Sequence, residues 1–209
     1  MTVTAVTAAL VYAALWVGYA QAWAWLTAVD RWFLEPAYDF GVDRLGWVNA
    51  WHVFCTVLGP DVLRGLTAIL AIVLLRRGRA RPAAFLLVCA VLSWVVTQTA
   101  KALADRPRPS TALVSTWSTS FPSGHALGVL VCVLALLTVL LPQVAERRRP
   151  WPVAAGAVLV VAIGVGRVVL NVHHPSDVVA GWALGYLCFL ACLPILRGGR
   201  DRAPTPATG

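Results

Sequence analysis

The chain has 209 residues, of which 59% are hydrophobic and 12% are charged, and its mean hydropathy is +0.76. Soluble domains carry about 25% charged residues, so this composition excludes an ordinary soluble fold and indicates a membrane protein. The net charge of +8 comes from short arginine clusters between apolar runs. Nucleic-acid-binding proteins spread their basic residues over a solvated face, so the pattern argues against a nucleic-acid partner.

Six charge-poor stretches predict membrane-spanning helices, each of which needs about 20 mostly apolar residues. In chain order they are residues 4–27, 60–75, 82–100, 124–141, 152–166 and 176–196. The second is short and contains Asp61 and Arg64 near its start, and the fifth can extend to Leu170. The aromatic stretch 47–58 is either a helix at the membrane interface or an extension of the second span. The predicted fold class is all-α, a six-transmembrane-helix bundle.

The connections between the predicted spans differ in charge. Arginines cluster at residues 76–81, 147–149 and 197–202. Cytoplasmic loops are enriched in Lys and Arg, so these three segments and the N-terminus are expected inside. The connections near 28–59, 101–123 and 167–175 then face outward, and the first of them holds most of the acids: Asp30, Glu35, Asp39 and Asp43.

The length fits one membrane-embedded domain, expected over residues 1–197, followed by a disordered Pro/Gly/Thr-rich tail at 198–209. The tripeptide at 20–22 resembles a signal-peptide cleavage site, but no basic residue precedes it, so the first span is expected to be retained. The five cysteines have no metal-ligand spacing and are expected to be buried as small apolar groups.

Polar residues are costly near a membrane, yet three polar groups lie at the predicted outer ends of spans. The first is Lys101 with residues 106–109, the second is 121–125, and the third is 166–167 with 173–177. They contain three of the four histidines and the only lysine of the chain. Their concentration at one membrane face indicates a site that folding assembles.

Three cations in these groups favour a multiply charged anion. Lys101, Arg108 and Arg167 come from separate segments, and the planar guanidinium fits phosphate oxygens. Ser123 is placed to cap the fourth span, whose N-terminal N–H groups would then point outward. Gly124 allows a ligand to approach the backbone. Because helix N-termini bind phosphate, the sequence predicts a phosphate site.

Two histidines add reactivity to this predicted site. Imidazole is a nucleophile and a proton carrier near neutral pH. His173 is followed at +4 by Asp177, an arrangement that suggests a nucleophile oriented by a carboxylate. His125 would then protonate the leaving alcohol and afterwards activate water. Taken singly, these residues also fit structural roles such as a helix cap or an interfacial anchor; their joint occurrence favours phosphoryl transfer through a phosphohistidine.

Three sequence segments resemble the motifs of the type 2 phosphatidic acid phosphatase (PAP2) superfamily. They are Lys101-x6-Arg108-Pro109, Pro122-Ser123-Gly124-His125 and Arg167-x5-His173-x3-Asp177. That superfamily includes vanadium haloperoxidases and bacterial phosphatidylglycerophosphate and prenyl-diphosphate phosphatases. The resemblance implies a metal-independent enzyme without a cofactor. It implies these roles: nucleophile His173, its partner Asp177, acid–base residue His125, and phosphate-binding residues Lys101, Arg108, Ser123, Gly124 and Arg167.

The chain departs from the family pattern at one position, and two residues beside the motifs need separate treatment. The third motif often begins Ser-Arg, whereas here it begins with Gly166, which puts a secondary hydrogen bond in doubt. Arg106 and Arg108 both precede a proline; the family spacing selects Arg108, and Arg106 is a candidate assistant. His174 matches no catalytic position and is treated as a neighbour that contacts substrate.

The sequence therefore predicts an integral membrane lipid phosphatase in the cell membrane, with its active site on the extracytoplasmic side. Phosphatidic acid, phosphatidylglycerophosphate and a prenyl diphosphate all remain candidate substrates, and the oligomeric state is open. Three alternatives compete with this prediction. They are a zinc hydrolase with His125, His173 and Asp177 as metal ligands, a haloperoxidase, whose known members are soluble, and a membrane protein that binds or transports anions or lipid phosphates without hydrolysis.

Overall fold

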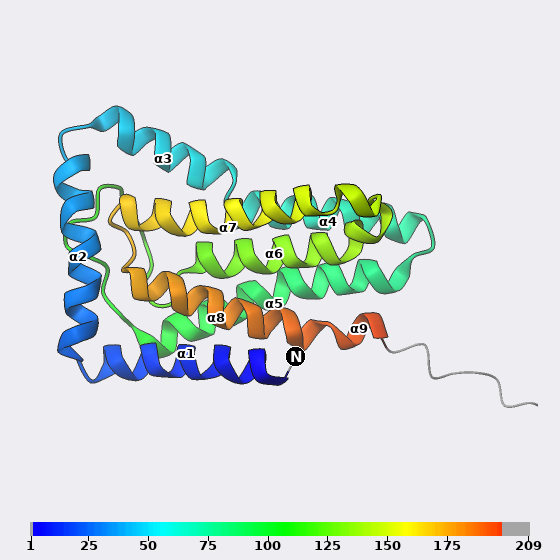
Figure 1. Ribbon diagram of the computed structural model, residues 1–209, viewed down its shortest axis with the longest axis horizontal. Helices are drawn as coiled ribbons and strands as arrows, with labels where there is room; N and C mark the ends of the chain where they lie inside the picture. Colours follow the sequence, from blue (N-terminus) through cyan, green and yellow to red (C-terminus); the bar gives the residue numbers. More distant parts are fainter. Residues whose placement is uncertain (1, 198–209) are drawn as a thin grey trace, which may run out of the picture.

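The computed structural model describes residues 2–197, so the tail expected at 198–209 lies outside the described residues. Long helices run side by side, and α2 lies across one end of the bundle (Figure 1). The elements are α1 (Thr2–Ala20), α2 (Ala24–Gly41), α3 (Leu45–Val57), α4 (Pro60–Arg76), α5 (Ala80–Ala104), α6 (Gly124–Leu140), η1 (Leu141–Gln143), η2 (Glu146–Arg148), α7 (Pro150–Val169), α8 (Pro175–Cys192) and α9 (Pro194–Arg197).

Within residues 2–197, six helical stretches are long and apolar enough to cross a membrane, which confirms the predicted all-α bundle of a multi-pass membrane protein. They are Thr2–Ala20, Leu45–Arg76, Ala80–Ala104, Gly124–Gln143, Glu146–Val169 and Pro175–Leu196. The five cysteines are free and buried in the bundle, as expected. The predicted boundaries are close for the last five spans, including 60–75, which corresponds to α4, whereas the first span needs correction.

The first predicted span, 4–27, is too long. The helix ends at Ala20, Ala22 adopts a left-handed backbone with φ +50°, and α2 then runs across the end of the bundle (Figure 1). α2 is amphipathic: it buries Leu26 and Leu34 and exposes a row of large apolar side chains, Trp25, Val29, Trp32, Phe33 and Phe40. Its polar residues prevent it from continuing the span, so the connection predicted at 28–59 contains two helices.

The stretch 47–58 forms a helix of its own. α3 ends at Val57, Gly59 is the N-cap of α4, and Pro60 occupies the first turn, where its missing N–H costs no hydrogen bond. The axes of α3 and α4 are inclined to each other in Figure 1. The candidate span Leu45–Arg76 therefore bends near Gly59.

The centre of the bundle is α6, which packs against α4, α5, α7 and α8. Its contact with α8 is very close: a Cβ at Gly181 would lie 2.6 Å from the carbonyl oxygen of Ser123. A side chain at this position would separate the two helices. The glycine therefore lets the beginning of α8 lie against the beginning of α6, which brings the second and third sequence groups together.

Candidate phosphate site

A polar cavity of about 380 Å³ lies where α3, α4, α5, α6 and α7 meet the loop that joins α5 to α6. Six of the eight predicted site residues line it: Lys101, Arg108, Gly124, His125, Arg167 and His173. The other two, Ser123 and Asp177, are fully buried beside it. Folding thus assembles the three sequence groups into one site, as the sequence predicted.

The N-terminus of α6 forms one wall of the cavity. Ser123 has extended backbone geometry, and its Oγ accepts a hydrogen bond from the Ala126 N–H at 3.4 Å. The Ser123 N–H donates to the Asp177 carbonyl at 2.9 Å. Gly124 and His125 follow in the first turn and line the cavity. The positive end of the helix dipole therefore faces the space that an anion would occupy.

Two of the cations hold the α5–α6 loop around the cavity. Lys101, in the last turn of α5, donates to the Thr119 carbonyl. Arg108 donates from Nε to the Ser118 carbonyl at 2.6 Å and from Nη1 to the Val172 carbonyl at 2.5 Å. Burial lowers the pKa of Arg108, but a guanidinium stays protonated in proteins. Both side chains are therefore held in place by the loop, and Arg108 is held as a cation.

The third cation, Arg167, lies in the last turn of α7 and is almost fully buried. Its side chain contacts the thiol of Cys55 from α3. Within residues 2–197, its Nε has no hydrogen-bond partner. An unsatisfied guanidinium nitrogen at a buried position is costly, and an anion in the cavity would satisfy it.

The His173 ring connects the cavity to a buried carboxylate. Its Nδ1 lies 3.5 Å from Asp177 Oδ2, and its Nε2 lies 3.3 Å from Arg108 Nη1, on the cavity side. The imidazole is 1% exposed. Burial, together with the charges of Arg167 and Arg108, lowers the pKa of His173 from 6.5 to about 3, against the opposite influence of Asp177. The ring is therefore neutral at neutral pH, and its Nε2 lies beside the Arg108 guanidinium.

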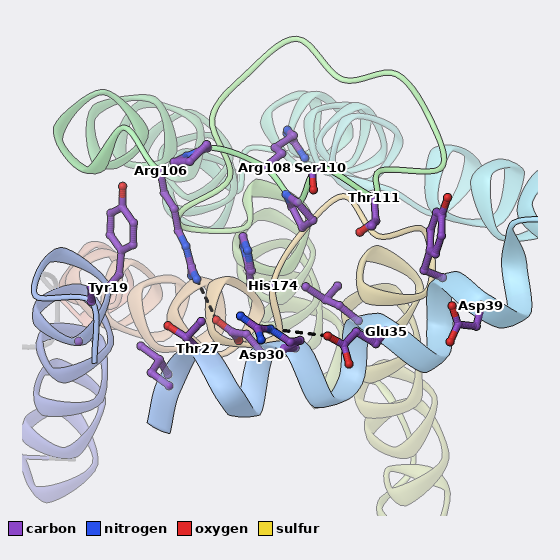
Figure 2. Close-up of a pocket in the computed structure, with 18 residues that line it drawn as sticks. Tyr19, Thr27, Asp30, Glu35, Asp39, Arg106, Arg108, Ser110, Thr111 and His174 are labelled. Carbon is purple, nitrogen blue, oxygen red and sulfur yellow. Dashed lines mark hydrogen bonds and ion pairs between the residues drawn. The ribbon is translucent and has the colours of Figure 1, made fainter. Parts of the chain in front are cut away.

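The two residues beside the motifs, Arg106 and His174, both lie against Asp177. Arg106 does not line this cavity; its guanidinium donates to Asp30 at 2.8 Å and to Asp177 at 2.7 Å. The His174 ring lies against Asp177, with Nδ1 3.2 Å from Oδ2. Both side chains line a second cavity of about 580 Å³ between α2 and the α5–α6 loop (Figure 2). His174 therefore lies outside the lining of the cavity that holds His173, and its contact with substrate stays a prediction.

Several residues that shape the site lie outside the predicted set. Asp30, one of the acids of the connection predicted at 28–59, is 2% exposed. His52 and Thr56 of α3 and Asp61 of α4 line the cavity with His173. No spacing within the chain links these residues to the three motifs, because the contacts join distant segments. Among these residues, only His52 stood out in the sequence as a possible site residue, because it is a histidine in an otherwise apolar stretch.

The departure at Gly166 has a structural explanation. A Cβ there would lie 2.6 Å from Cys55 Sγ and 2.8 Å from the ring of Trp51, both on α3. The side chains of α3 therefore fill the space where a serine side chain would begin. Because Cys55 also contacts Arg167, α3 supports the guanidinium from this side.

We expect Gly166→Ser to displace α3 and to lower stability by about 1–3 kcal/mol, the usual cost of overpacking. Phosphate release should fall as well, because Cys55 and Arg167 move with the contact. The matched control is Gly65→Ser, since a Cβ at this α4 glycine meets nothing within 4 Å. Thermal unfolding in detergent compares the two; equal melting temperatures would contradict the packing argument.

The zinc alternative needs a cluster of metal ligands. No group of three or more His, Cys, Asp and Glu side chains in the part of the chain that the structure describes is arranged to hold a metal ion. The Asp177 oxygens face Arg106, Ser120 and His174 as well as His173. The carboxylate is therefore surrounded by hydrogen-bond donors.

The fold and the cavity together define a multi-pass membrane protein with a cationic, histidine-containing site at one end of its bundle. Residues 82–200 match the PAP2 superfamily, and the chain belongs to this superfamily. The matched region contains all three motifs recognised in the sequence, so the predicted family is confirmed.

Two curated relatives share part of the sequence. Phosphatidylglycerophosphatase B of Bacillus subtilis is 38% identical over 90 residues, which cover 41% of this chain and 43% of the relative. An undecaprenyl-diphosphatase of Sulfolobus acidocaldarius is 37% identical over 73 residues, 34% of this chain and 32% of the relative. The chain thus spans less than half the length of the curated relatives it matches.

The fold resembles a solved structure over nearly its whole length. The crystal structure of a transmembrane PAP2-type phosphatidylglycerolphosphate phosphatase from Bacillus subtilis has a TM-score of 0.78. The match covers 96% of this chain and 99% of the other chain, at 23% identity. This similarity establishes the shared helical architecture.

Proposed function

We propose that this protein is a membrane lipid phosphatase that hydrolyses a phosphomonoester or diphosphate of a lipid through a phosphohistidine. The observation that carries the proposal is the convergence of three cations, a helix N-terminus and the motif histidines His125 and His173 on one cavity at the end of an apolar bundle. Membership of the PAP2 superfamily and the names of both curated relatives support it.

Binding of the phosphate group would use the charges already fixed around the cavity. Lys101, Arg108 and Arg167 neutralise the phosphoryl oxygens, and the N–H groups at Gly124 add hydrogen bonds from the start of α6. Because the donors are held by the loop and by α3, they need little reorganisation when charge spreads over the oxygens in the transition state.

In the first chemical step, His173 Nε2 attacks phosphorus while the bond between phosphorus and the leaving-group oxygen breaks. His125 donates a proton to that oxygen, so the lipid leaves as an alcohol, or as a lipid monophosphate from a diphosphate. Asp177, 3.5 Å from Nδ1, stabilises the imidazolium character of the phosphohistidine. In the second step His125 takes a proton from water, the water oxygen attacks phosphorus, the P–N bond breaks, and inorganic phosphate leaves.

Because His173 is buried, we expect its imidazole to stay neutral, and therefore nucleophilic, in mildly acidic solution. Its neutral form is lost only as the pH falls through the lowered pKa of about 3. We therefore expect the rate of phosphoenzyme formation to show no His173 titration between pH 7 and pH 5. The substrate for this measurement is an activated phosphate ester, whose leaving group needs no proton from His125. The measured rate is corrected for the ionisation of the ester itself. A loss with a midpoint near 6.5 would contradict this environment for the ring.

The active site is proposed to face the extracytoplasmic side of the cell membrane. The arginine-rich connection at 76–81 joins the far ends of α4 and α5, opposite the cavity, and such connections stay in the cytoplasm. Reporter fusions after Arg79 and after Pro109 test this orientation. A cytoplasmic reporter at the first position and an external one at the second are expected; the reverse pattern would place the site inside.

The proposed hydrolysis is tested with purified protein in mixed micelles containing excess chelator. Phosphate release is measured from phosphatidic acid, phosphatidylglycerophosphate and a prenyl diphosphate, the last two classes being suggested by the names of the curated relatives. Release from at least one lipid is expected, and the preferred lipid assigns the substrate. Binding without release from any of them would favour the anion-binding or transport alternative.

A further inference from the structure

We propose that Arg106 and Asp30 are positioning residues that hold Asp177 toward His173 and tie it to α2. The proposal rests on the proposed function, because it concerns the carboxylate behind the proposed nucleophile. Neither residue lines the cavity that contains His173. Both line the second cavity, where Arg106 extends from the α5–α6 loop toward Asp30 on α2 (Figure 2).

Arg106 joins two buried carboxylates. Its Nη2 donates to Asp30 Oδ2 at 2.8 Å, and its Nη1 donates to Asp177 Oδ1 at 2.7 Å and to Ser176 Oγ at 2.8 Å. The guanidinium also stacks on the Tyr19 ring, with Cζ 4.9 Å from the ring centroid. Planar guanidinium geometry suits such two-sided pairing, which a lysine ammonium would not reproduce.

Asp30 completes the arrangement at the start of α8. Its Oδ1 accepts the Ser176 N–H at 2.9 Å, and its Oδ2 accepts the Ser176 hydroxyl at 2.6 Å as well as the Arg106 guanidinium. Asp30 is 146 residues away from Ser176 in the sequence. The contact therefore fixes α2, which lies across the end of the bundle, directly beside the helix turn that carries Asp177.

The two oxygens of Asp177 have separate partners. Oδ1 is held by Arg106, whereas Oδ2 accepts the Ser120 hydroxyl and the His174 N–H, both at 2.8 Å, and faces His173 Nδ1. Loss of the Arg106 contact would free Oδ1 and allow the carboxylate to rotate. The orientation of the imidazole would then be less defined, while the three cations of the phosphate site would keep their own partners.

This arrangement predicts a separation between catalysis and anion binding. In Arg106→Met we expect kcat to fall by about 100-fold, the scale of a misplaced catalytic group. The inhibition constant of inorganic phosphate should change less than about threefold, because the variant leaves the phosphate-binding donors in place. Arg106→Lys should restore only part of kcat, since an ammonium cannot hold both carboxylates.

Asp30→Asn provides a second, nearly isosteric test. The amide oxygen can still accept from Ser176, but the charge opposite Arg106 is removed, and we expect a fall in kcat of about 10-fold with an unchanged inhibition constant for phosphate. Asp39→Asn is the matched control, because Asp39 is exposed on the same helix, and it should retain wild-type kcat. Circular dichroism and melting temperature in detergent report on folding.

Three outcomes would overturn the proposal. The first is wild-type kcat in folded Arg106→Met. The second is a rise in the phosphate inhibition constant that matches the loss of kcat, which would make Arg106 a phosphate ligand. If Arg106→Met does not fold, wild-type kcat in folded Asp30→Asn decides against the proposal. Absence of phosphate release by wild-type protein would refute the proposed function itself, whereas normal wild-type release with unaffected variants would refute only the positioning role.

Discussion

His173→Ala is expected to lower lipid phosphate release by at least about 10³-fold, because the variant has no atom to accept the phosphoryl group. The remaining cations would still bind substrate, so KM should change far less than kcat. Residual hydrolysis would come from charge stabilisation alone. Steady-state phosphate release in mixed micelles, with the amount of folded protein measured in parallel, gives both constants.

His52→Ala is the comparison for this variant. His52 also lines the cavity, but it comes from α3 and lies outside the three motifs. We expect this variant to retain phosphoenzyme formation, whereas His173→Ala should form none. Equal rates of release by His173→Ala and wild type would remove His173 from the mechanism.

His125→Ala is expected to show a different defect that depends on the leaving group. With a lipid alkyl ester, loss of the proton donor should slow the first step by about 10²- to 10⁴-fold. With p-nitrophenyl phosphate the leaving group needs no proton, so the first step should remain fast. The second step should be slow with either substrate, because no base activates water.

With p-nitrophenyl phosphate, a fast first step followed by a slow second step should produce a burst of p-nitrophenol. His125→Ala should release about one equivalent of p-nitrophenol per enzyme and then turn over slowly. His173→Ala should show no burst, since it cannot form the intermediate. A His125→Ala variant that loses the same factor on both esters, without a burst, would contradict the assignment of His125 to proton transfer.

The fold was largely predictable because membrane crossing imposes a length on apolar runs. The span containing His125 and the span that follows Pro175 were located within a few residues. The break after Ala20 was not predicted, since residues 21–27 are as uncharged as the span before them. The chain turns there because α2 packs against the end of the bundle, and this contact is a property of the tertiary structure.

The candidate site was predictable to the extent that its residues lie in compact groups. The resemblance to the PAP2 motif favours Arg108 over Arg106, and the structure places Arg108 on the cavity. The role of Arg106 could not be read from the sequence, because its partner Asp30 lies 76 residues away and looked like any other acid of an outer connection. The contacts at Gly166 likewise depend on the close approach of α3 to α7.

The most direct test of the central claim is to trap the intermediate. Wild-type protein is mixed for milliseconds with a ³²P-labelled lipid phosphate in the presence of chelator, quenched in alkali, and mapped by mass spectrometry. The mechanism predicts alkali-stable, acid-labile label on His173, at about one equivalent at most and absent from His173→Ala. Phosphate release by wild type without label on any histidine, or label that persists in His173→Ala, would contradict transfer through His173.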